Sequence, residues 1–259
     1  MSTFRTYRPM RFDWRRHFTP AIRWLILVNC GVFVLLKVGS LTVGPEVERA
    51  VFLWLGLIPY SVVHGLKVWQ PVTYLFLHAG VMHLIINMLT LWMFGCDLER
   101  SWGTRRFFTY YFITGVGAGL CVVLVNVLPE LWGHPQEPVV TVGASGAIYG
   151  ILMACALMYP DRQVWLLLPP IALPMRIFVL LWGAFAFFSS LEGSGNGISH
   201  IAHLGGLLVG YVYLRRGSFF YQARNRLTDW RQRRLRRKFE VYMREHREEP
   251  PREPDRWVH

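Results

Sequence analysis

A serine between small residues is the first candidate for chemistry in this chain. Ser145 follows Gly143 and Ala144 at the head of an apolar run that ends near Tyr159. A helix over that run would be about 22 Å long at ~1.5 Å per residue, whereas the hydrocarbon layer of a bilayer is about 30 Å thick. We therefore expect Ser145 to lie several ångströms below the outer membrane surface. Non-helical backbone at that depth must be buried in protein or line a wet cavity.

The same small residues have a plainer interpretation. Gly146 and Gly150 have the spacing that lets two membrane helices pack closely. Taken alone, the segment around Ser145 fits helix packing as well as catalysis. The decision must therefore come from residues elsewhere in the chain.

Two hydrogen-bond donors stand one helical turn apart in an earlier apolar run. His83 and Asn87 are four positions apart, so they share a helix face. A histidine ring nitrogen and an asparagine amide can both donate hydrogen bonds. Paired donors near a serine suit an oxyanion hole, which stabilises the charge of a tetrahedral intermediate.

A histidine in the last apolar run supplies a candidate base. His203 lies one turn before Gly206 on nearly the same helix face, and Gly206 and Gly210 form a second small-residue face. That face can approach the one formed by Gly146 and Gly150. Close packing of the two faces would bring the His203 imidazole near the serine hydroxyl. A serine nucleophile with a histidine base is the minimal arrangement for acyl transfer.

No aspartate stands at membrane depth to orient this histidine. Asp97 and Asp161 fall at the ends of apolar runs, on the side opposite the candidate site. The sequence therefore predicts a Ser–His dyad without a carboxylate. We expect either aromatic stacking or a small polar residue to orient the imidazole, and Tyr149, one turn after Ser145, is the candidate for stacking.

Histidines at membrane depth also admit a metal site. The four are His78, His83, His200 and His203. No HExxH motif occurs in the chain and no carboxylate accompanies these histidines at membrane depth. We therefore expect neither a metal nor another cofactor.

Composition places these residues in a membrane protein. Hydrophobic residues make up 53% of the 259-residue chain, which is too apolar for an ordinary soluble domain. Long apolar runs predict an all-α bundle of six transmembrane helices. The expected spans are about 21–38, 81–94, 107–128, 145–159, 175–191 and 198–214.

The net charge of +12 is distributed unevenly. Arginines gather before the first span, between the second and third, and after the last. Because cytoplasmic loops carry the excess of lysine and arginine, both termini are expected in the cytoplasm. The charge indicates topology, and no nucleic-acid-binding fold accompanies it.

Three parts are expected along the chain. Residues 1–20 form a basic cytoplasmic lead-in, residues 21–216 form the six-span domain, and residues 217–259 form a basic tail. The tail begins as an amphipathic helix, either near anionic inner-leaflet lipids or in solvent, and ends disordered.

The connections between the spans differ in expected structure. Residues 39–77 form a long first loop that should fold as short helices. Residues 95–106 are expected to be a cytoplasmic connection between spans. The prolines after residue 160 predict a segment that skims the cytoplasmic face.

Three motifs, in this order and spacing, resemble the rhomboid family of intramembrane serine proteases. They are His78 with His83-xxx-Asn87, then Gly143-Ala144-Ser145-Gly146, then Ala202-His203-xxx-Gly206-xxx-Gly210. Gly95-xx-Leu98-Glu99-xxx-Gly103-xx-Arg106-Phe107 is also similar to the family. The resemblance covers about residues 21–216. One departure is Gln70 after Trp69, where many members have arginine.

The resemblance implies the six-span bacterial form, with the first loop lying in the outer leaflet. It implies that Ser145 is the nucleophile and His203 the general base. His83, Asn87 and the Ser145 backbone N–H would form the oxyanion hole, and Tyr149 would pack on the imidazole. Substrates would be single-span membrane proteins, cut in or near the outer leaflet.

Two other functions compete with proteolysis. A catalytically silent rhomboid-like protein would bind membrane proteins without cutting them, but the presence of both Ser145 and His203 argues against it. A transporter or channel would need a polar path through both leaflets. The polar residues of this chain gather on one side instead.

Overall fold

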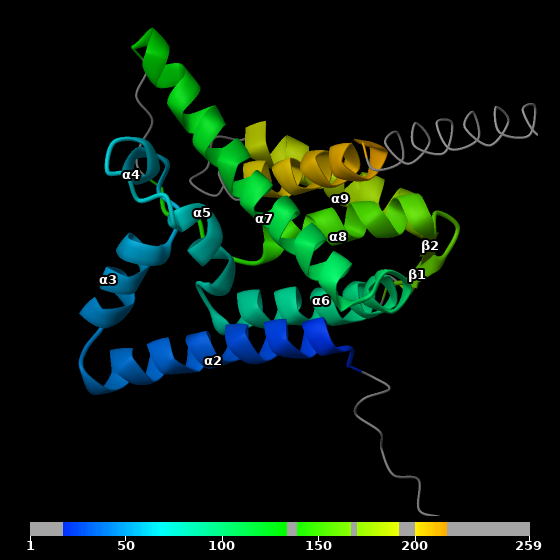
Figure 1. Ribbon diagram of the computed structural model, residues 1–259, viewed down its shortest axis with the longest axis horizontal. Coiled ribbons are helices and arrows are strands. Elements are labelled where there is room, and N and C mark those ends of the chain that lie inside the picture. Colours follow the sequence, from blue (N-terminus) through cyan, green and yellow to red (C-terminus); the bar gives the residue numbers. More distant parts are fainter. Residues whose placement is uncertain (1–17, 134–138, 167–169, 192–199, 217–259) are drawn as a thin grey trace, which may run out of the picture. The chain divides into compact units, whose positions relative to one another are not determined.

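The computed structural model describes residues 18–133, 139–166, 170–191 and 200–216. The chain divides into two compact units, residues 1–212 and 213–259. Only residues 213–216 of the second unit are described, so the fold below is that of the first (Figure 1). The predictions for the basic lead-in before residue 18, for the first two residues of the span at 198–214 and for the tail after residue 216 lie outside the described residues.

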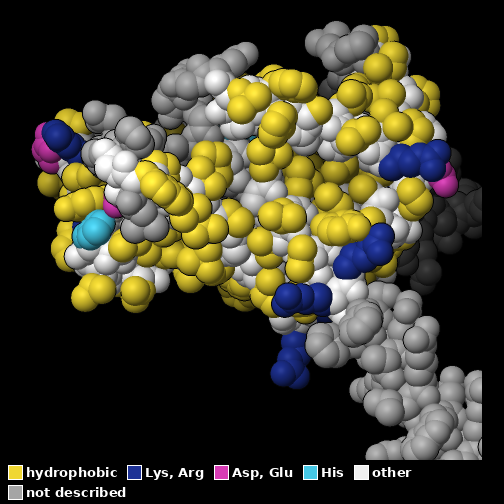
Figure 2. All heavy atoms as spheres, turned by 90° about the horizontal axis from the view of Figure 1, so that it is seen from above, with side chains coloured by type: hydrophobic (Ala, Val, Ile, Leu, Met, Phe, Trp, Pro, Cys, Tyr) yellow, Lys and Arg dark blue, Asp and Glu magenta, His cyan; other side chains and the backbone are white. Residues whose placement is uncertain are grey.

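Among the described residues, three helices are long and apolar enough to cross a membrane. They are α2 (Pro20–Thr42), α6 (Val81–Trp102) and α7 (Thr104–Val127), the last continued by the 3₁₀ turn η2 (Leu128–Trp132). α2 begins with proline at its first position, where no backbone N–H is needed. Large apolar side chains remain exposed along these helices, and hydrophobic side chains dominate the face in Figure 2. Such a surface suits contact with lipid.

Shorter apolar helices complete the bundle. α8 (Ser145–Met158) and α9 (Met175–Leu191) are followed by a helix at residues 200–216. α8 runs through the middle of the bundle and packs against α6, α7 and α9 (Figure 1). Its 14 residues span about 21 Å, less than the ~30 Å of a hydrocarbon layer. Its first residue, Ser145, is thus placed inside the bundle.

The helix that carries the second predicted span is longer than expected, and the expected connection at residues 95–106 is helical except at Gly103. α6 continues through Gly95 to Trp102, and α7 starts at Thr104. The chain turns at Gly103 alone, whose φ of +79° is readily adopted by glycine. The polar residues Asp97, Glu99 and Arg100 lie on α6, and the buried Glu99 is held by partners from other segments.

Glu99 joins three helices at this end of the bundle. Its carboxylate accepts hydrogen bonds from the backbone N–H groups of Ala21 (2.8 Å) and Ile22 (3.2 Å) at the start of α2. It also accepts from the hydroxyls of Thr19 and Thr104, the latter at the start of α7. Four donors around one carboxylate explain how an acidic side chain is only 3% exposed.

A β-hairpin occupies the segment that was expected to skim the cytoplasmic face. β1 (Gln163–Trp165) pairs antiparallel with β2 (Ala172–Pro174), with Val164 opposite Leu173. The prolines do prevent a continuous helix, but the chain satisfies its backbone by pairing with itself. Residues 167–169, at the tip, lie outside the described residues.

The first loop folds as short helices, as predicted. They are α3 (Glu46–Leu55), α4 (Pro59–Val63), α5 (Gln70–Thr73) and the 3₁₀ turn η1 (Tyr74–Phe76). α4 and α5 pack against α7, and η1 contacts α8. The loop therefore lies against the helices that carry the candidate site.

Candidate active site

Ser145 is the first residue of α8 and follows a backbone turn that requires glycine. Gly143 has a φ of +125°, which only glycine adopts without strain. A Cβ atom at Gly143 would lie 2.8 Å from Nε2 of His83 and 3.8 Å from Oγ of Ser145. The turn therefore brings the backbone against both side chains, and the absence of a side chain at Gly143 leaves room for them.

His203 lies within hydrogen-bond distance of Ser145. Its Nε2 is 2.9 Å from the Ser145 Oγ, although the two residues come from different helices. The helix at residues 200–216, the last helix in the described part of the chain, can approach α8 this closely because Gly206 has no Cβ atom. A Cβ atom there would collide with the Gly146 carbonyl oxygen. One turn on, a Cβ on Gly210 would lie 3.2 Å from Cα of Gly150. The two small-residue faces thus meet backbone against backbone.

The His203 ring is held by stacking. The Tyr149 ring lies parallel to it, with centroids 4.2 Å apart and an interplanar angle of 4°. His200 meets the same ring edge-on at 5.7 Å. The other ring nitrogen of His203, Nδ1, is buried and has no hydrogen-bond partner among the described residues. Aromatic packing therefore orients the His203 ring, whose Nε2 lies beside the Ser145 hydroxyl.

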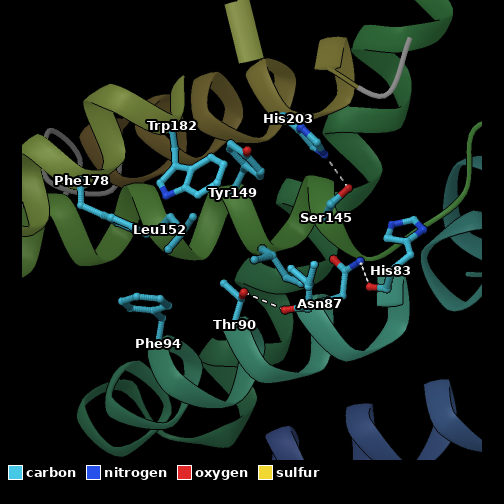
Figure 3. Close-up of a pocket in the computed structure, with 12 residues that line it drawn as sticks. His83, Asn87, Thr90, Phe94, Ser145, Tyr149, Leu152, Phe178, Trp182 and His203 are labelled. Carbon is cyan, nitrogen blue, oxygen red and sulfur yellow. Dashed lines mark hydrogen bonds between the residues drawn. The ribbon is translucent and has the colours of Figure 1, made fainter. Parts of the chain in front are cut away.

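The two predicted oxyanion donors lie on α6, facing the serine. The Asn87 amide donates one hydrogen bond to the backbone oxygen of His83 at 2.8 Å, which leaves its second N–H for another acceptor. Figure 3 shows His83, Asn87, Ser145 and His203 together at one end of a cavity. His78 lies behind them, 1% exposed, with its ring 5.2 Å from that of His83. It packs on the site without lining the cavity.

The cavity has a volume of about 240 Å³ and two different ends. Ser145, His203, His83 and Asn87 form its polar end, whereas its other end is mainly apolar (Figure 3). The apolar part is lined by Ile86, Phe94, Ile148, Leu152, Phe178 and Trp182, with Thr90 between the two ends. α6 and α9 approach each other there through the stacked rings of Phe94 and Phe178, 5.9 Å apart.

Sequence reasoning missed the residues at the apolar end. One face of α6 runs along the length of the cavity. It carries residues spaced three or four positions apart, namely His83, Asn87, Thr90 and Phe94. That periodicity was a usable signal on α6. Phe178 and Trp182 on α9 had none, because nearly every residue of that helix is apolar.

The histidines do not assemble a metal site in the described parts of the chain. No three His, Cys, Asp or Glu side chains there are close enough to hold a metal ion. The two aspartates that the sequence placed away from the site bind arginines instead. Asp97 pairs with Arg100 and Arg162, and Asp161 pairs with Arg176.

The site and the helices that carry it match a known protein family. The model of the Rhomboid domain matches residues 65–218, which is more than half of the chain and includes every residue of the site described above. The chain belongs to the rhomboid family. The match starts within the first loop, so α2, α3 and α4 of this rhomboid lie before the matched residues.

Rhomboid relatives come from plants and bacteria. RHOMBOID-like protein 1 of Arabidopsis thaliana is 32% identical over 164 residues, covering 62% of this chain and 38% of that protein. Rhomboid protease GlpG of Salmonella choleraesuis (strain SC-B67) is 26% identical over 196 residues, covering 73% and 60%. Rhomboid protease GluP of Bacillus subtilis (strain 168) is 31% identical over 146 residues, covering 55% and 25%. The chain thus spans less than two thirds of each relative's length.

Proposed function

We propose that this rhomboid is an intramembrane serine endopeptidase that uses Ser145 as nucleophile and His203 as general base. The observation that carries the proposal is the 2.9 Å separation of Ser145 Oγ and His203 Nε2 at the polar end of a cavity among apolar helices. Serine is a weak nucleophile unless an adjacent base takes its proton. Here the imidazole of His203 is within hydrogen-bond distance of the Ser145 hydroxyl.

The acylation step follows from this geometry. The Ser145 oxygen attacks the scissile carbonyl carbon while His203 Nε2 takes the hydroxyl proton. The resulting oxyanion is stabilised by the Ser145 backbone N–H, the His83 ring and the free N–H of Asn87. When the C–N bond breaks, His203 returns the proton to the leaving amine, and the acyl group stays on Ser145.

Deacylation repeats the sequence with water. His203 takes a proton from a water molecule, whose oxygen attacks the acyl-enzyme carbonyl. Collapse of the second tetrahedral intermediate breaks the ester and returns the proton to Ser145. During both steps the imidazolium has no carboxylate partner in the described residues, so the stacked Tyr149 ring is what keeps it aligned.

The shape of the cavity favours membrane-protein substrates. An extended peptide is needed at Ser145, so a transmembrane substrate must unwind locally before its carbonyl reaches the serine. Segments with glycine or proline unwind most readily. The apolar end of the cavity, between α6 and α9, then accommodates a hydrophobic part of a single-span protein. The cut falls in or near the outer leaflet.

The same proposal includes the membrane arrangement. α2, α6 and α7 with the shorter α8, α9 and the last helix make up six spans, with the first loop at the outer leaflet. Both termini lie in the cytoplasm of a cell whose inner membrane holds the protein, and the basic tail lies near anionic inner-leaflet lipids. No cofactor takes part in the reaction.

Cleavage of a model transmembrane substrate tests the function. Purified wild type, Ser145→Ala and His203→Ala are compared in detergent, and product formation is followed with time. The proposal predicts cleavage by the wild type alone. A rhomboid-like protein that only binds membrane proteins would retain the substrate uncut in all three, and equal cleavage by all three would remove the dyad assignment.

A further inference from the structure

The segment that leads into Ser145 is held in place by the first loop. Leu57 and Thr141 exchange two backbone hydrogen bonds, each 2.9 Å long. The Gly143 N–H then donates to the backbone oxygen of Tyr74 at 2.9 Å. Three backbone hydrogen bonds therefore connect the first loop to the residues that precede the nucleophile.

Direct packing reinforces this connection. A Cβ atom at Gly56 would lie 2.6 Å from Cγ1 of Val140 and 2.5 Å from the Phe52 carbonyl oxygen. The loop backbone at residue 56 is therefore in contact with the segment before Ser145. Because Gly143 borders both His83 and Ser145, a shift of this segment would move the backbone between the nucleophile and an oxyanion donor.

One side chain, Gln70, holds the loop end of this connection. Gln70 is fully buried, and its Oε1 accepts a hydrogen bond from the Ile58 N–H at 3.0 Å. Its Nε2 donates to the carbonyl oxygens of Leu53 (3.3 Å) and Trp54 (3.4 Å) at the end of α3. A single neutral amide thus satisfies an N–H and two carbonyls, and Ile58 adjoins the residue that pairs with Thr141.

We propose that Gln70 is a positioning residue for the reaction, acting through Ile58, the Leu57–Thr141 pair and Gly143. The inference rests on the proposed function and adds a residue that does not line the cavity. Its essential atom is Oε1, the acceptor for the Ile58 N–H. An arginine at this position has five donors and no acceptor, so the residue common in the family does not replace Gln70 in this chain.

Three substitutions separate the acceptor from the donors. Gln70→Glu keeps an oxygen for the Ile58 N–H, Gln70→Arg keeps only donors, and Gln70→Met keeps neither. Trp69→Phe is the matched control, because it removes one donor to the Trp54 oxygen in the same loop and leaves Ile58 untouched.

Since a misplacement of about 1 Å can lower a rate by ~100-fold, we expect kcat to fall at least tenfold in Gln70→Arg and Gln70→Met. We expect kcat within threefold of wild type in Gln70→Glu and Trp69→Phe.

Hydrogen–deuterium exchange measures the structural coupling without any need for activity. In full-length Gln70→Arg and Gln70→Met, exchange at residues 57–58 and 141–143 should accelerate together, whereas α2 should exchange as in wild type. Trp69→Phe should leave residues 141–143 protected. Hydrogen–deuterium exchange can be measured whether or not the protein cleaves a substrate. An inactive wild type would therefore contradict the proposed function, while the coupling of Gln70 to residues 141–143 could still be tested.

Kinetics on the model transmembrane substrate then distinguishes positioning from stability. The account predicts lower kcat with KM changed less than threefold, at temperatures where all variants are folded. Wild-type kcat in Gln70→Arg, or acceleration of exchange at residues 57–58 alone, would overturn the inference.

Discussion

Gly206 and Gly146 pack so closely that a Cβ atom on Gly206 would collide with the Gly146 carbonyl oxygen. This contact sets the distance between the last helix, which carries His203, and α8, which begins at Ser145. The hydrogen bond between the two side chains thus depends on the absence of a side chain one turn away. Packing and chemistry are therefore linked through a single backbone approach.

Gly206→Ala should separate the two helices and lower the cleavage rate by ~100-fold, because the imidazole would move out of reach of the serine. The measurement is the initial rate on a transmembrane substrate in detergent. Gly31→Ala is the control, since a Cβ atom at Gly31 on α2 meets nothing within 4 Å. A Gly206→Ala variant that cleaves at the wild-type rate would contradict the account.

Glu99 should be among the most important residues for stability. Replacing it with alanine leaves two backbone N–H groups and two hydroxyls without their acceptor in a buried site. We expect Glu99→Ala to lower the free energy of unfolding by about 3–5 kcal/mol, as for breaking a buried charged network. Thr104→Val, which removes one of the four donors, should cost about 1 kcal/mol. Equal losses from the two variants in denaturant titrations would show that the carboxylate is not the centre of this cluster.

His78 should make the protein less stable in mild acid. Burial lowers the pKa of His78 to about 4, with a smaller contribution from the neighbouring His83. The unfolded chain takes up this proton near pH 6.5, whereas the folded protein resists it. Stability is therefore fully present above pH ~6.5 and falls as the pH drops toward 4. Thermal unfolding from pH 7.5 to 4.5 should show a shallower pH dependence in His78→Gln, and identical slopes would refute this role.

Thr90 should affect which substrates enter the cavity. Thr90 lines the cavity and its hydroxyl donates to the Ile86 carbonyl oxygen at 2.7 Å, so a leucine at this position would add bulk to the cavity wall. Thr90→Leu should raise KM for a transmembrane substrate about tenfold or more, while a small serine-reactive probe still labels the protein. Thr109→Leu on α7 is the control, because Thr109 makes the equivalent bond to Arg105 on an exposed face. A KM that is unchanged in Thr90→Leu would mean that the substrate does not use this part of the cavity.

Local sequence patterns predicted the helices and the faces on which they meet. Small residues every fourth position marked the α8 face and the last-helix face, and Gly206 does contact Gly146. The length of the apolar run after Ser145 predicted a helix too short to cross a bilayer by itself, and α8 has 14 residues. These features follow from periodicity, which acts over a few residues and can be seen in one sequence.

Long-range partners explain what the sequence did not predict. Asp97, Glu99 and Arg100 were assigned to a connection between spans, yet all lie on α6, where Glu99 binds the start of α2 and Asp97 pairs with Arg162. The hairpin of β1 and β2 was missed because its pairing joins residues about ten positions apart across prolines. The apolar end of the cavity was missed because it depends on which side chains leave space unfilled, a property of the packed bundle.

The most direct test of the Ser–His pair is covalent labelling by a fluorophosphonate probe, which forms a phosphonyl ester only with an activated serine. The adduct is mapped by mass spectrometry in wild type, His203→Ala and Tyr149→Ala. The account predicts one adduct, on Ser145, that is lost in His203→Ala and formed more slowly in Tyr149→Ala. No adduct on Ser145 in the folded wild type, or undiminished labelling in His203→Ala, would contradict it.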